Sequence, residues 1–264
     1  MDDISFRQIL DRLGYSWQGY AKVRKGVKKR ISRHMQELDC HATEDYLHAL
    51  NNPQMLKEVE RLMSVSISYF FRDRYLWQAL GEEILPGIIG RYNEKINVWS
   101  AGCALGQEVY SFAILWDILS NRFDQLPKLQ IRASDINSDY LERARGGIYS
   151  GSSLKGLSDK IKATYFLTSE DKSNYLVADC LKKNIQWEVH DLLGQPITEK
   201  FQIILLRNSL LTYYRKDRRT PAFLTVLDSL DDGGFFIIGS HEKLPCQTHT
   251  LLPFKGCSYI LQKT

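Results

Sequence analysis

The N-terminal third of the chain carries apolar side chains at the three- and four-residue intervals of amphipathic helices. The two clearest stripes are Phe6, Ile9, Leu10 and Leu13, and then Val23, Val27, Ile31, Met35 and Leu38. Further helices are predicted over Glu44–Leu50, Gln54–Val65 and Arg74–Gly90. We therefore expect residues 4–90 to be helical and residues 1–90 to form a helical N-terminal domain.

The pattern changes at Ile96, where short apolar runs bounded by turn residues replace the helical stripes. These runs cover residues 96–101, 129–136, 185–192, 201–206 and 235–239, the last opened by a turn at 231–234. Helices are predicted between them over residues 108–119, 139–145 and 218–230. Strands that alternate with helices are typical of a parallel sheet covered by helices, which predicts an α/β domain over residues 91–264.

Two segments of this second half fall outside the alternation. Residues 147–184 contain several Gly and Ser and then short apolar runs, which predict a small subdomain of two or three antiparallel strands. The tail Leu251–Leu261 is expected to add one final strand at the edge of the main sheet.

Composition agrees with a globular protein of one to two domains. The 264 residues are 44% hydrophobic and 25% charged, which excludes a disordered chain. No run of 18 apolar residues predicts a membrane span, and the acidic N-terminus does not resemble a secretory signal. The five cysteines lie far apart without a C-x-x-C pair, so we expect no disulfide framework, no zinc site and a cytoplasmic location. Nothing in the sequence indicates the oligomeric state.

The net charge of +4 comes from one segment. Its seven basic residues are Lys22, Arg24, Lys25, Lys28, Lys29, Arg30 and Arg33, without which the chain would carry −3. They occupy the helix faces that the second apolar stripe leaves open. This surface suits an acidic partner, although a solvated outer face or a phosphate contact is also compatible with it. No nucleic-acid motif accompanies it, so no nucleic-acid partner is predicted.

A glycine turn and an acidic residue indicate a cofactor. The first predicted strand runs into Gly102 and Gly106, and the second ends at Asp135. The spacing is neither G-x-G-x-x-G nor a phosphate loop, while an acid after the second strand can bind both ribose hydroxyls. Together these features favour a nucleoside cofactor without pyrophosphate, such as S-adenosylmethionine. The alternative is a tight turn with a capping or surface aspartate.

At this point the sequence resembles the CheR-type chemotaxis receptor methyltransferases over nearly its whole length. That family uses S-adenosylmethionine to esterify glutamate side chains of bacterial chemoreceptors. The residues that resemble its motifs are Lys29-Arg30, Ser66–Asp73, Val98–Ser111, Ser134–Asn137 with Ala144–Tyr149, Leu206–Asn208 and Gly239–Glu242. Six such matches in order form a strong signal, where any one alone would be weak.

The resemblance implies a role for each matching residue. The resemblance implies that the cofactor is bound by Ser68, Arg72, Gly102, Ala104, Glu108, Asp135, Asp191, Leu192, Asn208 and Ser209. It implies catalytic roles for Arg72 and Tyr213. It also implies that acidic receptor helices, or a related acidic protein, contact Lys25, Lys28, Lys29, Arg30 and Arg33. The product would be S-adenosylhomocysteine.

Each of these roles has a plainer alternative. Glu108 can bind the methionine amino group or simply favour the first turn of a helix. Asp191, near the adenine, and Asn208, near the amino-acid end, are also common turn residues. Arg72 can orient a carboxylate through paired hydrogen bonds, or serve in a structural ion pair. Structural roles are expected for His190 and His241, and a structural role stays open for Arg207, which lies at the buried end of a predicted strand.

The implied reaction is a methyl transfer to a glutamate carboxylate, which is already ionised near neutral pH and needs no general base. The sequence departs from the family at Gln107, Val109 and Ser68, and above all at Thr212, where the family places a tyrosine that Tyr213 would have to replace. A methyltransferase for another carboxylate or a small molecule, or a cofactor-binding module without catalysis, therefore stay open as alternatives.

Overall fold

The apolar stripes at the start of the chain pack against one another in a helical layer. The computed structural model describes residues 1–170 and 173–264. The helices of this layer are α1 (Asp3–Leu13), α2 (Trp17–Tyr20), α3 (Arg24–Glu37), α4 (Thr43–Ala49) and α5 (Pro53–Met63). Asn52 caps α5, and Pro53 occupies its first turn, where a missing N–H costs nothing. Phe6, Ile31 and Val59 are fully buried in its core.

Residues 64–73 are not helical, so the prediction of an all-helical stretch from 4 to 90 is wrong at this segment. Helix α5 ends at Met63, and the next helices are α6 (Arg74–Ala79), the π-helical turn η1 (Leu80–Ile84) and α7 (Leu85–Ile89). The backbone N–H groups of the segment bond elsewhere: Phe70 N donates to Ser153 O, and Phe71 N to Ser111 Oγ. Phe71 and Asp73 also have positive φ angles, which an α-helix excludes.

The predicted α/β architecture is present. Its parallel strands are β1 (Lys95–Ala101), β2 (Lys128–Asp135), β6 (Ile185–Val189), β7 (Phe201–Leu206) and β8 (Leu230–Ile238). The strand order is β6-β2-β1-β7-β8-β10-β9. The associated helices are α8 (Gln107–Ser120), α9 (Ser138–Gly146), α11 (Leu210–Tyr213) and α12 (Lys216–Asp228).

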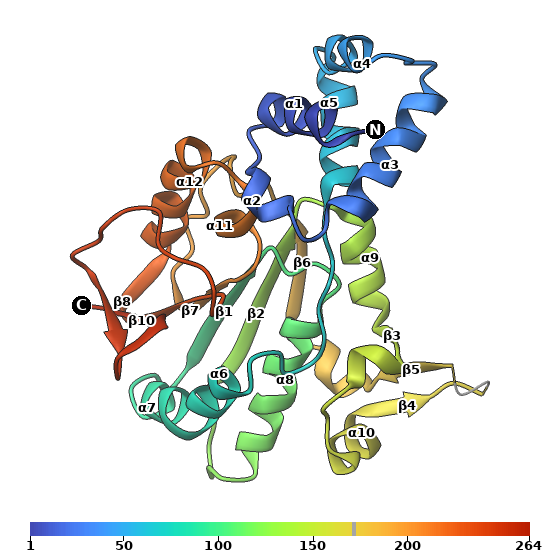
Figure 1. Ribbon diagram of the computed structural model, residues 1–264. Coiled ribbons are helices and arrows are strands. Elements are labelled where there is room, and N and C mark those ends of the chain that lie inside the picture. The colour runs from blue at the N-terminus through green and yellow to red at the C-terminus, as the bar shows by residue number, and fades with distance from the viewer. Residues whose placement is uncertain (171–172) are drawn as a thin grey trace.

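Two cores cover the two faces of this sheet. Successive strand residues point to opposite faces, so Val98 packs with α6 to α8 while Trp99 packs with α12. Figure 1 shows α1 to α5 grouped at one end of the molecule, away from α6 and α7. The described residues include no helix long and apolar enough to cross a membrane.

The strand boundaries differ from prediction in three places. Strand β6 stops at Val189, so Asp191 and Leu192 lie in the loop beyond it. Strand β8 begins at Leu230 and contains the predicted turn, which a shift in pairing with β7 accommodates. The tail forms two strands, β9 (Leu251–Phe254) and β10 (Cys257–Lys263), because the left-handed pair Lys255 and Gly256 turns the chain back.

A small antiparallel sheet is also present, as predicted. It consists of β3 (Ile148–Ser150), β5 (Asn174–Val177) and β4 (Phe166–Thr168), in that spatial order. Short helices accompany it: η2 (Gly151–Leu154), α10 (Asp159–Tyr165) and η3 (Asp179–Lys182). Residues 171–172 of the predicted subdomain lie outside the described residues. Figure 1 shows the small sheet at the edge of the molecule beyond α9.

The helical layer joins the sheet near the carboxyl ends of its parallel strands. Ser16 N donates to Tyr213 O at 2.7 Å, and Arg215 N donates to Gly14 O at 3.0 Å. Ligands of open parallel sheets bind beyond these strand ends, so the junction is where a site is expected.

Candidate cofactor and active site

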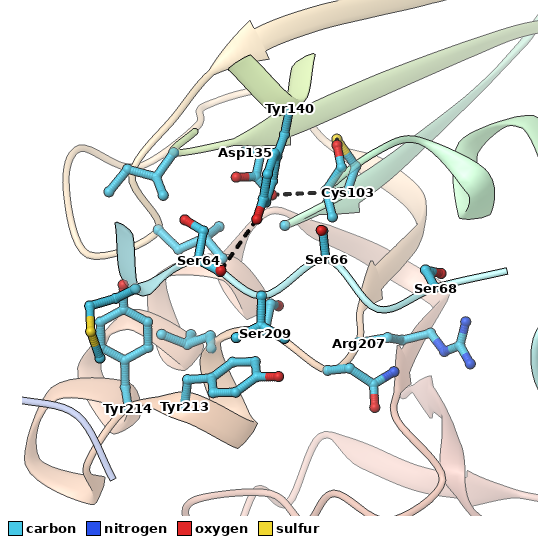
Figure 2. Close-up of a pocket in the computed structure, with 18 of the residues that line it drawn as sticks. Ser64, Ser66, Ser68, Cys103, Asp135, Tyr140, Arg207, Ser209, Tyr213 and Tyr214 are labelled. Atoms are coloured by element: carbon cyan, nitrogen blue, oxygen red, sulfur yellow. Dashed lines mark hydrogen bonds between the residues drawn. The ribbon is translucent and has the colours of Figure 1, made fainter. Parts of the chain in front are cut away.

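A cavity lies between the helical layer and the carboxyl ends of β1, β2, β6 and β7. It encloses about 1050 Å³ of empty space, part of which opens to solvent. All of the residues predicted to bind cofactor or act in catalysis line it, namely Ser68, Arg72, Gly102, Ala104, Glu108, Asp135, Asp191, Leu192, Asn208, Ser209 and Tyr213. Figure 2 shows Ser64, Ser66 and Ser68 following one another along the segment that crosses this cavity.

The loop between β1 and α8 depends on left-handed backbone conformations. The φ angles are +82° at Gly102, +48° at Ala104 and +83° at Gly106. A Cβ atom on Gly102 would lie 2.7 Å from the Cβ of Ser209, so only glycine lets the loops after β1 and β7 approach this closely. The predicted glycine turn therefore joins two loops of the cavity.

Asp135 ends β2 and holds the same loop. Its carboxylate accepts hydrogen bonds from Ala104 N and Asn137 N, each at 2.9 Å. Burial raises the pKa of the Asp135 carboxyl above its ordinary value, while the N–H groups of Asn137 and Ala104 oppose that rise. A carboxylate has about four acceptor positions, so two bonds leave room for the hydroxyl groups of a ligand.

Glu108, in the first turn of α8, belongs to a buried ion network. Arg207, whose side chain is 3% exposed, donates from Nη1 to Glu108 Oε2 at 2.7 Å. The other guanidinium nitrogen of Arg207 pairs with Asp73, and Ser100 Oγ donates to Glu108 Oε1 at 2.8 Å. Glu108 therefore faces the cavity in a fixed orientation, and Arg207 supports it from the end of β7.

A second carboxylate organises the loop after β7. Asn208, at φ +53°, donates its backbone N–H to Glu242 Oε2 at 3.0 Å, and Gly239 N donates to the same oxygen at 2.6 Å. The Thr212 hydroxyl donates to Glu242 Oε1. Thr212, at the position of the family tyrosine, thus supports this loop through Glu242 and does not line the cavity.

Tyr213 lines the cavity where Thr212 does not. Its ring packs against Tyr20 with centroids 4.9 Å apart, and Figure 2 shows its hydroxyl directed inward from α11. No hydrogen-bond partner of this hydroxyl is present among the described residues. Burial raises the pKa of the Tyr213 phenol, against a smaller lowering by Arg72, so the group stays neutral near pH 7. It can donate a hydrogen bond but cannot act as a base there.

Arg72 carries the unpaired positive charge of the cavity. Its Nη1 donates to Ile67 O at 3.0 Å, and its guanidinium lies 6.0 Å from the Tyr69 ring centroid. Its own carbonyl accepts from Trp77 Nε1 at 2.7 Å, which fixes the backbone. Across the described residues no carboxylate pairs with Arg72, so several of its five N–H donors are available to a ligand.

Asp191 and Leu192 border the cavity from the loop after β6. Asp191 Oδ1 accepts from Leu193 N at 2.9 Å, which is the geometry of a turn residue, the alternative role of Asp191. His190 donates its backbone N–H to Asp135 O at 3.1 Å, and burial lowers the pKa of its ring. An uncharged imidazole therefore lies beside these residues near neutral pH.

The basic face of α3 lies outside the cavity and divides into two groups. Lys25, Lys29 and Arg33 are exposed at intervals of four residues and form one line on the helix. Lys28 Nζ pairs with Asp3 at 2.9 Å, and the Arg30 guanidinium donates to two backbone carbonyls of residues 62 and 64. Of the five residues predicted to contact an acidic acceptor, Lys25, Lys29 and Arg33 are thus exposed and have no ion-pair partner among the described residues, while Lys28 and Arg30 bond within the chain.

Several further residues line the cavity that the sequence pattern does not predict. They are Tyr15, Tyr20, Glu60, Ser64, Ser66, Tyr140 and Tyr214. Among them, only Ser66 belongs to a segment that resembles a family motif. The others lie outside the motif segments: Tyr20, Glu60 and Tyr140 are on helices, while Tyr15, Ser64 and Tyr214 are in the connections next to helices. Their spacing along the chain does not indicate that they meet.

The donor set fits S-adenosylmethionine. This ligand carries a positive sulfonium, an ammonium group and two ribose hydroxyls, which carboxylates match, and a carboxylate of its own, which the Arg72 guanidinium matches. Asp135, Glu108 and Asp191 surround the cavity, and Leu192 and Met63 add apolar surface for an adenine ring. The residues present therefore satisfy the chemistry of the cofactor.

Comparison with known proteins gives the family. The model described as "CheR methyltransferase, SAM binding domain" matches residues 66–260. A chemotaxis protein methyltransferase of Listeria monocytogenes is 30% identical over 76% of this chain and 74% of its own. A putative methyltransferase, Cher3, of Pseudomonas putida is 28% identical over 92% and 89%. Chemotaxis protein methyltransferase 1 of Vibrio cholerae is 30% identical over 83% of this chain and 80% of its own. The chain belongs to the CheR methyltransferase family, and its cofactor is S-adenosylmethionine.

Proposed function

We propose that this protein is a protein-glutamate O-methyltransferase that acts on the cytoplasmic helices of a chemoreceptor or on a related acidic signalling protein. The observation that carries the proposal is Arg72, a cation with free N–H donors at the cofactor cavity. A guanidinium binds a carboxylate through two parallel hydrogen bonds, so it selects an acidic acceptor.

The chemistry needs positioning more than proton transfer. S-adenosylmethionine supplies a methyl group on a positively charged sulfonium, which an ionised carboxylate can accept without losing a proton. Arg72 would hold the acceptor carboxylate, and the neutral Tyr213 hydroxyl would donate to its second oxygen or exclude water. Holding two reactants in line can contribute about 7–11 kcal/mol towards a barrier.

The exposed cations of α3 suit the proposed acceptor. Lys25, Lys29 and Arg33 repeat every four residues, and an acidic helix presents carboxylates at the same interval. Such a surface raises the rate of encounter with a negatively charged partner and weakens with salt. The Listeria and Vibrio relatives are named chemotaxis protein methyltransferases, which supports the same acceptor class.

The test is transfer of a labelled methyl group. The protein is incubated with methyl-labelled S-adenosylmethionine and membranes that carry the chemoreceptors of the same source. We expect label on the receptors that mild base releases as methanol, because a glutamyl methyl ester is base-labile. Label that resists base contradicts the proposal, and cofactor binding without any transfer would favour the non-catalytic module.

Two variants separate the parts of the proposal. Arg72→Met is expected to lower turnover about 100-fold, the usual cost of one lost transition-state donor. S-adenosylhomocysteine affinity is measured in the same variant, because Arg72 is also a predicted cofactor-binding residue, and turnover at saturating cofactor isolates the acceptor contact. Replacing Lys25, Lys29 and Arg33 together by Glu is expected to raise KM for the receptor and leave kcat nearly unchanged. Full transfer by the Arg72 variant would remove Arg72 from its role.

A further inference from the structure

Residues 63–68 form one wall of the cofactor cavity, and we call them the 63–68 wall. All six line the cavity. They include the last residue of α5 and the start of the irregular segment that follows, so their backbone groups lack regular partners. Of the six, Met63 is buried, Ile67 is exposed and the others are half-buried, so it is bonds from other parts of the chain that fix the backbone of this segment.

Side chains from three other elements bond the carbonyl groups at the start of this wall. Tyr20 of α2 donates to Met63 O at 3.1 Å, and Tyr140 of α9 donates to Ser64 O at 3.2 Å. From α3, Arg30 Nε donates to Leu62 O at 2.7 Å, and its Nη2 donates to Ser64 O at 2.8 Å. Figure 2 shows the Tyr140–Ser64 bond at the edge of the cavity.

Arg30 is the one of these side chains that spans two carbonyls. Its planar guanidinium reaches Leu62 O and Ser64 O together, and its charge lies at the C-terminal end of α5, where a cation is favoured. A lysine has a single nitrogen on a flexible stem and cannot hold two separated carbonyls in the same fixed geometry.

We propose that Arg30 is a positioning residue of the cofactor site, which fixes the 63–68 wall by bonding the end of α5. Arg30 thus acts on cofactor binding and is not part of the acceptor-docking surface. Because it lies on the same helix as Lys25, Lys29 and Arg33, it also connects the docking surface to the cavity. The inference requires the cofactor but no acceptor, so it can fail independently of the proposed function.

The test is cofactor affinity measured without any acceptor. Arg30→Lys keeps the charge and removes the two-carbonyl geometry, and Arg24→Lys is the matched control. Arg24 lies on α3 too, but its guanidinium bonds Ala21 O and Asp3, away from the cavity. We expect calorimetry to show S-adenosylhomocysteine binding about fivefold weaker in Arg30→Lys, as for one lost hydrogen bond, and unchanged in Arg24→Lys.

Hydrogen exchange provides a second readout. Amides of residues 63–68 are expected to exchange faster in Arg30→Lys than in the parent chain, and those of α1 are not. Unchanged affinity and exchange in Arg30→Lys would overturn the proposal. Equal losses in both variants would overturn it as well, since they would show a general effect of α3.

Discussion

The two sides of the cofactor cavity are built differently. The floor consists of the loops after β1, β2 and β7. Residues of the sheet and of these loops hold it, as in the hydrogen bond from Ala104 N to the Asp135 carboxylate. The 63–68 wall is held by side chains from α2, α3 and α9. We conclude that the floor is held mainly by the sheet, its loops and the Arg207 ion network, whereas the wall depends on how the helices α2, α3 and α9 are placed.

The largest expected effect concerns the floor. Arg207→Met removes the cation that pairs with both Glu108 and Asp73. The two carboxylates then lie without a cation next to the buried side chain of residue 207. The free energy of unfolding should fall by about 3–5 kcal/mol, as when one member of a buried ion pair is removed. Urea denaturation measures this change.

An exposed arginine provides the control for Arg207. Arg215 pairs with Asp217 at 3.0 Å, but its side chain is 43% exposed. Arg215→Met should therefore cost less than about 1 kcal/mol. Similar losses in the two variants would contradict the view that the floor rests on a buried ion network.

A smaller effect is expected at the glycine turn. Gly102→Ala places a Cβ in a left-handed conformation, which costs about 1–2 kcal/mol, and forces it against Ser209. Stability and S-adenosylhomocysteine affinity should both fall. Gly26→Ala, inside α3 with open space around the new methyl, should instead stabilise the chain by up to about 1 kcal/mol. If Gly26→Ala lowered stability as Gly102→Ala does, the cost would not come from the left-handed conformation and close contact at Gly102.

The smallest effect is expected at the wall. Tyr140→Phe removes one donor to Ser64 O, but Arg30 still bonds that carbonyl, so unfolding should change by no more than about 1 kcal/mol. Cofactor affinity should fall a few-fold. Tyr165→Phe removes a comparable hydroxyl bond, to Asp117 Oδ2 at 2.8 Å, away from the cavity, and should leave affinity unchanged. If cofactor affinity fell in Tyr165→Phe and not in Tyr140→Phe, the proposed support of the wall by Tyr140 would be contradicted.

This contrast explains what the sequence can predict. The floor residues follow strands, and strand ends are readable from apolar runs and turn residues, so the sequence alone places Gly102, Asp135 and Asn208 at one edge of the sheet. Glu242 belongs to a segment that resembles a family motif, yet its bonds to Asn208 and Thr212 depend on how two loops meet.

The wall and its supports are harder to predict. The stretch from 4 to 90 is predicted to be helical as a whole, but the apolar residues Val65, Ile67 and Tyr69 alternate. The backbone of Phe70 and Phe71 bonds Ser153 and Ser111 instead of a helical turn. Arg30 belongs to a run of basic residues and cannot be distinguished from Lys29 by charge pattern. Only the folded chain shows that one bonds backbone while the other faces solvent.

The way in which the wall is supported limits how this enzyme can be recombined with its relatives. A chimera that exchanges the N-terminal helices, in order to transfer acceptor preference, would also exchange Tyr20 and Arg30. On the proposed role of Arg30, the hybrid would lose cofactor affinity unless the donated helices bring a phenol and a guanidinium to the same two places. Grafting only the exposed positions 25, 29 and 33, the proposed docking surface, leaves Tyr20 and Arg30 in place. On the proposed roles, acceptor preference is therefore better exchanged by residue than by segment.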